Sequence, residues 1–280
     1  MCRMVELHQA VLAKNDAGAQ ELRAELAERG CVAVNLLSSP GSGKTALLEA
    51  ELTLARERGV PVAALTADLA TENDALRLAR SGMPVKQVLT DGLCHLEAAM
   101  LRGHLAGWLP ADTRLLFVEN VGNLVCPASY DLGESLRVAL ASVTEGEDKP
   151  LKYPTAFGLA NLVVVTKTDL AEAAEFDREG FLANVARVNP GVEVLFNSAR
   201  TGQGRGELLE RALAVLAGGP VHRPVLACAP GHDHGDGHGG GHDHDHDHGD
   251  GAGHTHGDGA GHTHGDGHTH EHAHTSAGRS

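Results

Sequence analysis

Aromatic side chains are scarce in this chain of 280 residues, where they make up 3% of the positions, with one tryptophan and two tyrosines. Proteins that hold single-stranded nucleic acid need such rings as stacking platforms. Basic residues are also few: 23 Lys and Arg stand against 37 Asp and Glu, and the formal net charge is -14. Both deficits argue against a nucleic-acid-binding surface as the main function of the chain.

Long apolar runs and paired cysteines are missing as well. No run reaches the roughly 18 apolar residues that a membrane-spanning helix needs. The stretch from Met1 to Leu12 lacks the basic start, apolar core and small-residue cleavage site of a secretory signal. Five cysteines, an odd number, do not suggest a disulfide framework. We therefore expect a cytoplasmic protein with reduced thiols.

Histidine, by contrast, is abundant at one end of the chain. Fifteen of the 19 histidines lie between His232 and His274, and the last fifty residues carry a charge of -8. Because this segment has almost no large apolar side chains, we expect residues 221–280 to form a linker and a tail that is disordered without metal. Imidazoles alternating with carboxylates suit Ni, Cu or Zn with weak selectivity. The candidate tail ligands are His232, His234, His242, His244, His246, His248, His254, His256, His262, His264, His268, His270, His272 and His274.

The rest of the chain alternates helical and strand patterns. Residues 5–29 have the spacing of one or two amphipathic helices interrupted around Asn15–Gly18, which predicts an N-terminal helical segment over residues 1–30. Further helices are expected over residues 46–58, 68–80 and 206–216. Strands are expected at residues 31–37, 60–66, 115–119, 136–143, 162–166 and 192–196. This alternation predicts an α/β domain over residues 31–220, with a mostly parallel sheet flanked by helices.

A glycine-rich sequence, Ser38-Ser39-Pro40-Gly41-Ser42-Gly43-Lys44-Thr45, lies between an expected buried strand and a helix. This is the context of a phosphate-binding loop and makes the domain a P-loop NTPase. Gly41 and Gly43, on either side of Ser42, let backbone N–H groups turn toward phosphate oxygens. Lys44 is expected to reach the β- and γ-phosphates, and the Thr45 hydroxyl to ligate Mg²⁺. The general pattern of a phosphate-binding loop begins with Gly where this chain has Ser38. The alternative to a phosphate-binding loop is an ordinary glycine-rich turn between a strand and a helix.

Another motif, Thr166-Lys167-Thr168-Asp169, follows the expected strand at residues 162–166. A carboxylate at Asp169 can accept hydrogen bonds from N1–H and the 2-amino group of guanine, and adenine has neither donor. The Lys167 stem would pack on the base, and backbone N–H groups near Ser198 and Ala199 would complete the pocket. Alone, the motif is equally typical of a solvated strand end. Together with the phosphate loop, it favours GTP.

Two acidic residues follow other strands. Asp68 follows the second of the expected strands and Glu119 follows the third, and the carboxyl ends of strands line the ligand crevice of an open α/β sheet. We expect these carboxylates to hold Mg²⁺ and to position the attacking water. The Gly122 amide is expected to bond the γ-phosphate and to release it on hydrolysis. Helix capping is the alternative for Asp68 and for Asp74.

Cys94, His95 and Cys126 form the last candidate group. Two thiolates and an imidazole suit Zn²⁺ or Ni²⁺ and leave one position for water, a substrate or a partner chain. Cys126 follows Glu119 and Gly122 along the same segment, so the state of the nucleotide could move a metal ligand. The alternative is two buried free cysteines and a polar histidine.

Together these residues resemble the HypB family, the GTPases that assist nickel insertion during hydrogenase maturation. The resemblance covers about residues 5–217 and is most specific in the runs 39–45 and 119–127, which occur here with a His-rich tract; the run 149–154 matches too. The family has Ser at the position of Ser38. The resemblance implies slow hydrolysis of GTP to GDP, Mg²⁺, and a homodimer that forms with nucleotide bound.

The resemblance also implies a Ni²⁺ or Zn²⁺ site near the dimer interface, with Cys94, His95 and Cys126 as its ligands. The tract resembles a nickel storage segment, and the implied partners are a nickel-carrying maturation protein and the hydrogenase large-subunit precursor. Some members begin with a C-x-x-C-G-C nickel site, of which this chain has only Cys2. There are three alternatives. A urease-type nickel-insertion GTPase is disfavoured by the three ligand candidates, and passive nickel storage is disfavoured by an intact Lys44. A small-molecule kinase is disfavoured by the guanine motif.

Overall fold

The computed structural model describes residues 2–68, 73–90 and 92–228, and within these ranges not the side chains of residues 2–8, 68 and 228. The tail ligands expected between His232 and His274 therefore lie outside the described residues, and so do the side chains of Asp68 and Cys2. The described residues belong to one compact unit. No described helix is long and apolar enough to cross a membrane.

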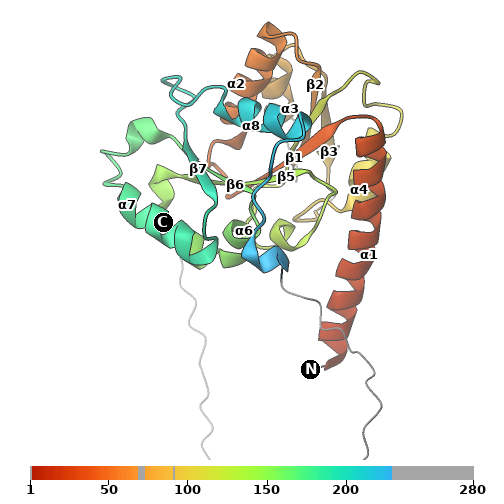
Figure 1. Ribbon diagram of the computed structural model, residues 1–280, viewed down its shortest axis with the longest axis horizontal. Helices are drawn as coiled ribbons and strands as arrows, with labels where there is room; N and C mark the ends of the chain where they lie inside the picture. The colour runs from red at the N-terminus through yellow and green to blue at the C-terminus, as the bar shows by residue number, and fades with distance from the viewer. Residues whose placement is uncertain (1, 69–72, 91, 229–280) are drawn as a thin grey trace, which may run out of the picture. The chain divides into compact units, whose positions relative to one another are not determined.

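A seven-stranded sheet, parallel in every pairing, organises the described residues (Figure 1). The strand order is β3-β2-β4-β1-β5-β6-β7, so β1 lies between β4 and β5. The strands are β1 (Val32–Ser38), β2 (Val62–Asp68), β3 (Val85–Leu89), β4 (Leu115–Glu119), β5 (Leu136–Ser142), β6 (Leu162–Thr166) and β7 (Glu193–Phe196). From β1 the chain continues to β2 on one side of β1, and from β4 it crosses to β5 on the opposite side of β1. This reversal of strand order opens a ligand crevice at the carboxyl end of β1.

Helices cover both faces of this sheet. They are α1 (Cys2–Glu28), α2 (Lys44–Glu57), α3 (Asn73–Ala79), α4 (Ala98–Leu105), α5 (Lys149–Lys152), α6 (Pro154–Gly158), α7 (Arg178–Val188) and α8 (Glu207–Leu216). Figure 1 shows α2, α3 and α8 above the sheet, α6 and α7 below it, and α1 beside α4 on the right. The expected fold, a mostly parallel sheet flanked by helices, is confirmed.

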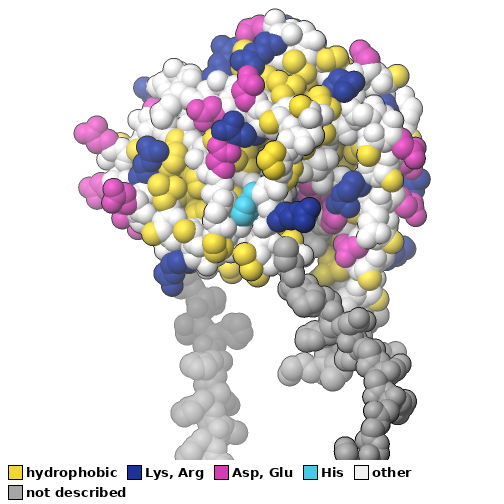
Figure 2. Space-filling model, viewed as in Figure 1, with side chains coloured by type: hydrophobic (Ala, Val, Ile, Leu, Met, Phe, Trp, Pro, Cys, Tyr) yellow, Lys and Arg dark blue, Asp and Glu magenta, His cyan; other side chains and the backbone are white. Residues whose placement is uncertain are grey.

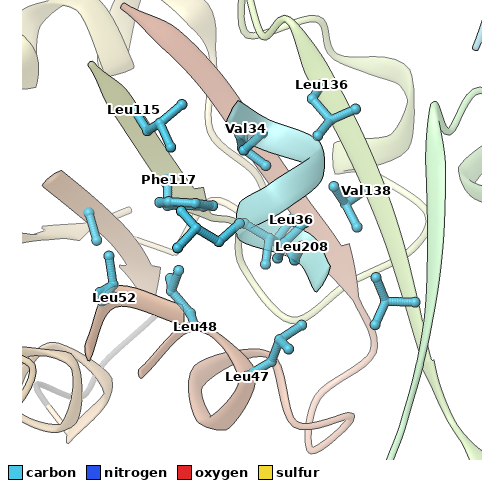
Figure 3. Packing of buried hydrophobic residues seen from close by; sticks show 14 of the residues in the cluster. Val34, Leu36, Leu47, Leu48, Leu52, Leu115, Phe117, Leu136, Val138 and Leu208 are labelled. Atoms are coloured by element: carbon cyan, nitrogen blue, oxygen red, sulfur yellow. The ribbon is translucent and has the colours of Figure 1, made fainter. Parts of the chain in front are cut away.

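The core has one cluster on one face of the sheet and two on the other. Leucines of α2 and α8, such as Leu48 and Leu208, pack against Val34, Leu36 and Phe117 on the first face (Figure 3). Side chains of α1 and α4 cover one half of the second face, and those of α6 and α7 cover the other half. Because β4 and β6 are covered on both faces, they are nearly continuous apolar runs rather than alternating ones.

The N-terminal helix is continuous, and no interruption occurs at Asn15–Gly18. The Asn15 side chain is buried, donates to the Asp131 carbonyl at 2.8 Å and accepts from the Ala98 amide at 2.9 Å. Gly18 lies in the same contact, where an added Cβ would meet the Ala98 Cβ at 3.8 Å. These polar and small residues thus mark the place where α1 meets α4 rather than a helix break.

Charge is mixed on the surface of the described residues. Figure 2 shows acidic and basic side chains interspersed over the face that Figure 1 presents. This pattern matches the sequence, in which the last fifty residues carry most of the net negative charge.

Candidate functional site

The glycine-rich loop connects the carboxyl end of β1 to the first residue of α2, Lys44. Gly41 and Gly43 have φ values of 73° and 93°, a left-handed backbone that glycine adopts without the cost of a Cβ clash. The Thr166 hydroxyl donates to the Ser42 carbonyl and ties the loop to the end of β6. The loop therefore directs the N-terminus of α2 at the crevice.

A cavity of about 530 Å³ lies over this loop. The Lys44 ammonium is 2.9 Å from the Ser38 hydroxyl, so the serine that departs from the general pattern holds the loop lysine. Gly122 packs on the loop from the β4 side, where a Cβ would come within 3.1 Å of the Pro40 Cα. The structure thus brings Gly122, Lys44 and the end of β4 to one cavity, as the sequence predicts.

Glu145 anchors the loop from the β5 side, and sequence reasoning missed it. Its carboxylate accepts from the Ser42 hydroxyl at 3.0 Å, the Ser142 amide at 2.8 Å and the Lys149 ammonium at 2.8 Å. Burial opposes ionisation, but the Lys149 ammonium and the Ser142 amide outweigh it and hold the pKa of Glu145 below its ordinary value. The only sign of this anchor in the sequence is Lys149, at the start of a run quoted for the family resemblance.

Acidic groups surround the Thr45 hydroxyl. Its Oγ1 atom is 2.6 Å from Glu119 Oε1 and 3.0 Å from Asp74 Oδ1. Burial raises the pKa of Glu119, and its Oε2 atom has no hydrogen-bond partner within the described part of the chain. A hydroxyl and two carboxylates, one with an orphaned buried oxygen, are donors that a hard divalent cation prefers. The residues present therefore fit Mg²⁺, and Asp74 belongs to the group, whereas the side chain of Asp68 lies outside the description.

A cavity of about 360 Å³ lies at the end of β6. Lys167 has a left-handed backbone, with φ 56°, which costs a non-glycine residue about 1–2 kcal/mol, and its ammonium donates to the Gly41 carbonyl at 2.7 Å. Asp169 accepts from the Ser198 hydroxyl at 2.6 Å and lies 3.4 Å from the Arg200 guanidinium. Ala199 lines the same cavity. Lys167, Asp169 and Ala199 thus line one cavity at the end of β6.

Cys94, His95 and Cys126 are neighbours. The Cys94 Sγ and His95 Nδ1 atoms are 3.7 Å apart, and the Cys126 thiol beside Cys94 raises the pKa of Cys94. The His95 ring stacks on Tyr130 with centroids 3.9 Å apart. Its buried Nε2 atom has no hydrogen-bond partner among the described residues. Within those residues of the single chain, no group of three or more His, Cys, Asp or Glu side chains converges on one metal position.

A buried polar network connects this group to the nucleotide cavity. Asn120, which follows Glu119 directly, donates to Asn35 at 3.4 Å, and Asn35 donates to Glu134 at 3.3 Å. Arg137 donates to Glu134 at 2.6 Å and to the carbonyls of Ala128 and Tyr130 at 3.0 Å each. Both ends of the β4–β5 connection, which contains Gly122 and Cys126, are therefore held by the same network.

Comparisons with known proteins agree with this geometry. The family profile described as CobW/HypB/UreG, nucleotide-binding domain, matches residues 32–196. Hydrogenase maturation factor HypB of Azotobacter vinelandii is 48% identical over 207 residues, which are 74% of this chain and 68% of that protein. The same factor from Escherichia coli K12 is 48% identical over 208 residues, 74% of this chain and 71% of that protein.

Two solved structures are similar as well. The crystal structure of HypB from Archaeoglobus fulgidus has a TM-score of 0.67 and 38% identity, and covers 73% of this chain and all of that one. HypB from Helicobacter pylori in complex with nickel also has a TM-score of 0.67, with 35% identity, and covers 76% of this chain and 98% of that one.

Proposed function

Because the chain belongs to the HypB family, we propose that it is a GTP-hydrolysing nickel metallochaperone that assists nickel insertion into the hydrogenase large-subunit precursor. The observation that carries the proposal is the meeting of three parts at the carboxyl edge of one sheet: the phosphate loop, the carboxylates around Thr45 and the pocket at Asp169. A structure of a relative in complex with nickel supports nickel as the cargo.

In this proposal, the nucleotide extends from the loop to Asp169. Loop N–H groups and Lys44 bind the phosphates, and Asp169 accepts from the two guanine donors. Asp169 is 11% exposed, so water competes weakly for its oxygens. Charge-assisted hydrogen bonds contribute about 1.5–3 kcal/mol each, which is enough to separate GTP from ATP.

Hydrolysis would depend on the acidic group at Thr45. Bound Mg²⁺ would neutralise charge on the phosphates, and Thr45, Glu119 and Asp74 would supply oxygens for it. Asp68, whose side chain lies outside the described residues, stays a predicted ligand. Gly122 places a backbone amide next to the loop, where it can bond the γ-phosphate. The resemblance to the family implies slow turnover of GTP to GDP and phosphate.

Nickel or zinc would bind at Cys94, His95 and Cys126. Since these three do not close a site within the described part of one chain, a ligand from a second copy would complete it, in a homodimer that forms with nucleotide bound. The network from Asn120 to Arg137 supports coupling, because it links the β4 end of the nucleotide cavity to the segment that carries Cys126.

The supply of nickel and the location of the protein complete the proposal. Residues 221–280 would collect and store nickel through their histidines, and a nickel-carrying maturation protein would exchange metal with this chain. Cys31, Cys94 and Cys126 are free thiols, which supports a cytoplasmic location.

The direct test of this function is nucleotide turnover. Purified full-length protein should hydrolyse GTP in the presence of Mg²⁺ and leave ATP nearly untouched, with phosphate release as the measurement. Equal turnover of ATP and GTP would reject the guanine assignment and favour a kinase-like or general NTPase role.

A further inference from the structure

Arg77, on α3, forms part of the boundary between the two cavities of the nucleotide site. Four residues line both the cavity over the loop and the cavity at Asp169: Gly43, Ala46, Arg77 and Lys167. A nucleotide with its phosphates on the loop and its base at Asp169 must cross this boundary with its ribose and α-phosphate. Arg77 therefore borders the ribose and the α-phosphate of such a nucleotide.

Two contacts fix where Arg77 lies. On α2, Thr45 and Glu49 are one turn apart, and on α3, Asp74 and Arg77 are one turn apart, so each pair shares a helix face. Thr45 meets Asp74 at 3.0 Å, and Glu49 meets the Arg77 Nε atom at 2.7 Å. These two parallel contacts set the register of α3 on the loop helix and hold the guanidinium at the rim of the cavity.

The ion pair that Arg77 forms with Glu49 lies at the surface and can be exchanged for another partner. The Arg77 side chain is 45% exposed, and that of Glu49 is 25% exposed. Surface ion pairs of this kind contribute little, because water screens them and two long side chains must be ordered. A guanidinium binds a phosphate through two parallel hydrogen bonds, which is a stronger and more directional interaction.

The other cation at the boundary is already committed. The Lys167 ammonium donates to the Gly41 carbonyl at 2.7 Å, and its stem borders the base cavity. Asp74 also lines the phosphate cavity. Lys44, Lys167 and Arg77 all line this cavity, so the charge of Arg77 adds to the positive charge that a nucleotide with two or three phosphates meets there.

We propose that Arg77 is a nucleotide-binding residue that exchanges Glu49 for the α-phosphate when a guanine nucleotide binds. This inference rests on the proposed function, because it requires that the site binds GTP and GDP. Since both nucleotides carry the α-phosphate, Arg77 stabilises both bound states to a similar extent. In this role Arg77 fastens α3 to the ligand without taking part in cleavage of the γ-phosphate.

The test uses calorimetric affinities of the full-length chain for GDP and for a non-hydrolysable GTP analogue. Arg77→Gln should weaken both by a similar factor of about tenfold or more, and Arg77→Lys should lie between Arg77→Gln and the parent. Glu49→Gln is the matched control, because it breaks the same ion pair but frees Arg77. It should bind both nucleotides as tightly as the parent or more tightly, and both Gln variants should unfold at the same temperature without nucleotide.

Three results would overturn the inference. The first is an Arg77→Gln variant that binds both nucleotides with the affinity of the parent. The second is an equal loss of affinity in Glu49→Gln, which would make the ion pair purely structural. The third is a loss of affinity confined to the GTP analogue, which would place the guanidinium on the γ-phosphate. A parent that binds ATP but no guanine nucleotide would instead reject the proposed function.

Discussion

Asp169→Asn tests the guanine pocket most sharply. The change keeps the size of the side chain and one acceptor oxygen, so the contact of 2.6 Å with the Ser198 hydroxyl can remain. It replaces a charged acceptor, 11% exposed, with an amide. One charge-assisted hydrogen bond lost at such a site costs about 1.5–3 kcal/mol. We therefore expect the affinity for GDP to fall by about 10- to 150-fold.

The same variant should gain a different ligand. Xanthine has a carbonyl oxygen where guanine has its 2-amino group, and the new amide can donate to that oxygen. Calorimetry with GDP and with XDP should show opposite changes in affinity for Asp169→Asn. Asp177→Asn, which alters the N-terminal cap of α7 by the same chemistry, should bind both ligands like the parent. Unchanged GDP affinity in Asp169→Asn would refute the assignment of the base pocket.

Three further changes test the remaining parts of the account. Lys44→Ala should abolish GTP turnover while the folded fraction, measured by circular dichroism, stays parental; turnover at the parental rate would reject the phosphate-loop role. Deletion of residues 231–280 should remove most bound nickel, measured by elemental analysis, and leave GTP turnover intact; full nickel stoichiometry after the deletion would contradict the role of the tail. In the full chain, nickel binding by the tail should fade below about pH 6, because imidazoles with a reference pKa of roughly 6.5 become protonated. Glu51, which is buried and accepts from the Gly206 and Leu209 amides at 2.8 and 3.0 Å, has its pKa raised by burial from 4.5. Because the folded state takes up this proton at a higher pH than the unfolded state, the contribution of Glu51 to stability falls as pH rises through that window. Glu51→Gln should remove this slope in urea unfolding and cost about 1–3 kcal/mol at neutral pH, since one amide loses its acceptor; an identical slope in both proteins would show that another group titrates.

The sequence predicts the parts of the fold that depend on burial of the sheet. The run at residues 162–166 is apolar at nearly every position because both faces are covered, so its strand is evident. The edge strand β3 is not evident, because Lys86 and Gln87 interrupt the apolar residues of Val85–Leu89 and the strand is only partly buried. Sequence periodicity also missed α4 and α7. The interruption considered at Asn15–Gly18 is absent because the Asn15 side chain finds partners 83 and 116 residues away, which local patterns do not encode.

The site shows the same division. The loop and Asp169 are contiguous motifs at strand ends, so their chemistry can be predicted from residue types and spacing. Glu145 contacts Ser42, which is 103 residues away, and Arg77 contacts Glu49, which is 28 residues away. Only the packing of the sheet and of α3 brings these residues to the nucleotide site. Cys94 and Cys126 lie close together, but spacing could not show that no three candidate ligands converge within the described part of one chain.

The most direct test of the central proposal is a nickel titration of the chain without residues 231–280, in its GTP-analogue and GDP states. If the network from Asn120 to Arg137 transmits the state of the nucleotide to Cys126, the two nickel affinities should differ by about 1–3 kcal/mol, and nickel should change nucleotide affinity by the same factor. Cys126→Ala should remove both the tight site and the difference between the two states. Equal nickel affinities in the two nucleotide states would contradict a GTP-driven metallochaperone and leave the site as a static one.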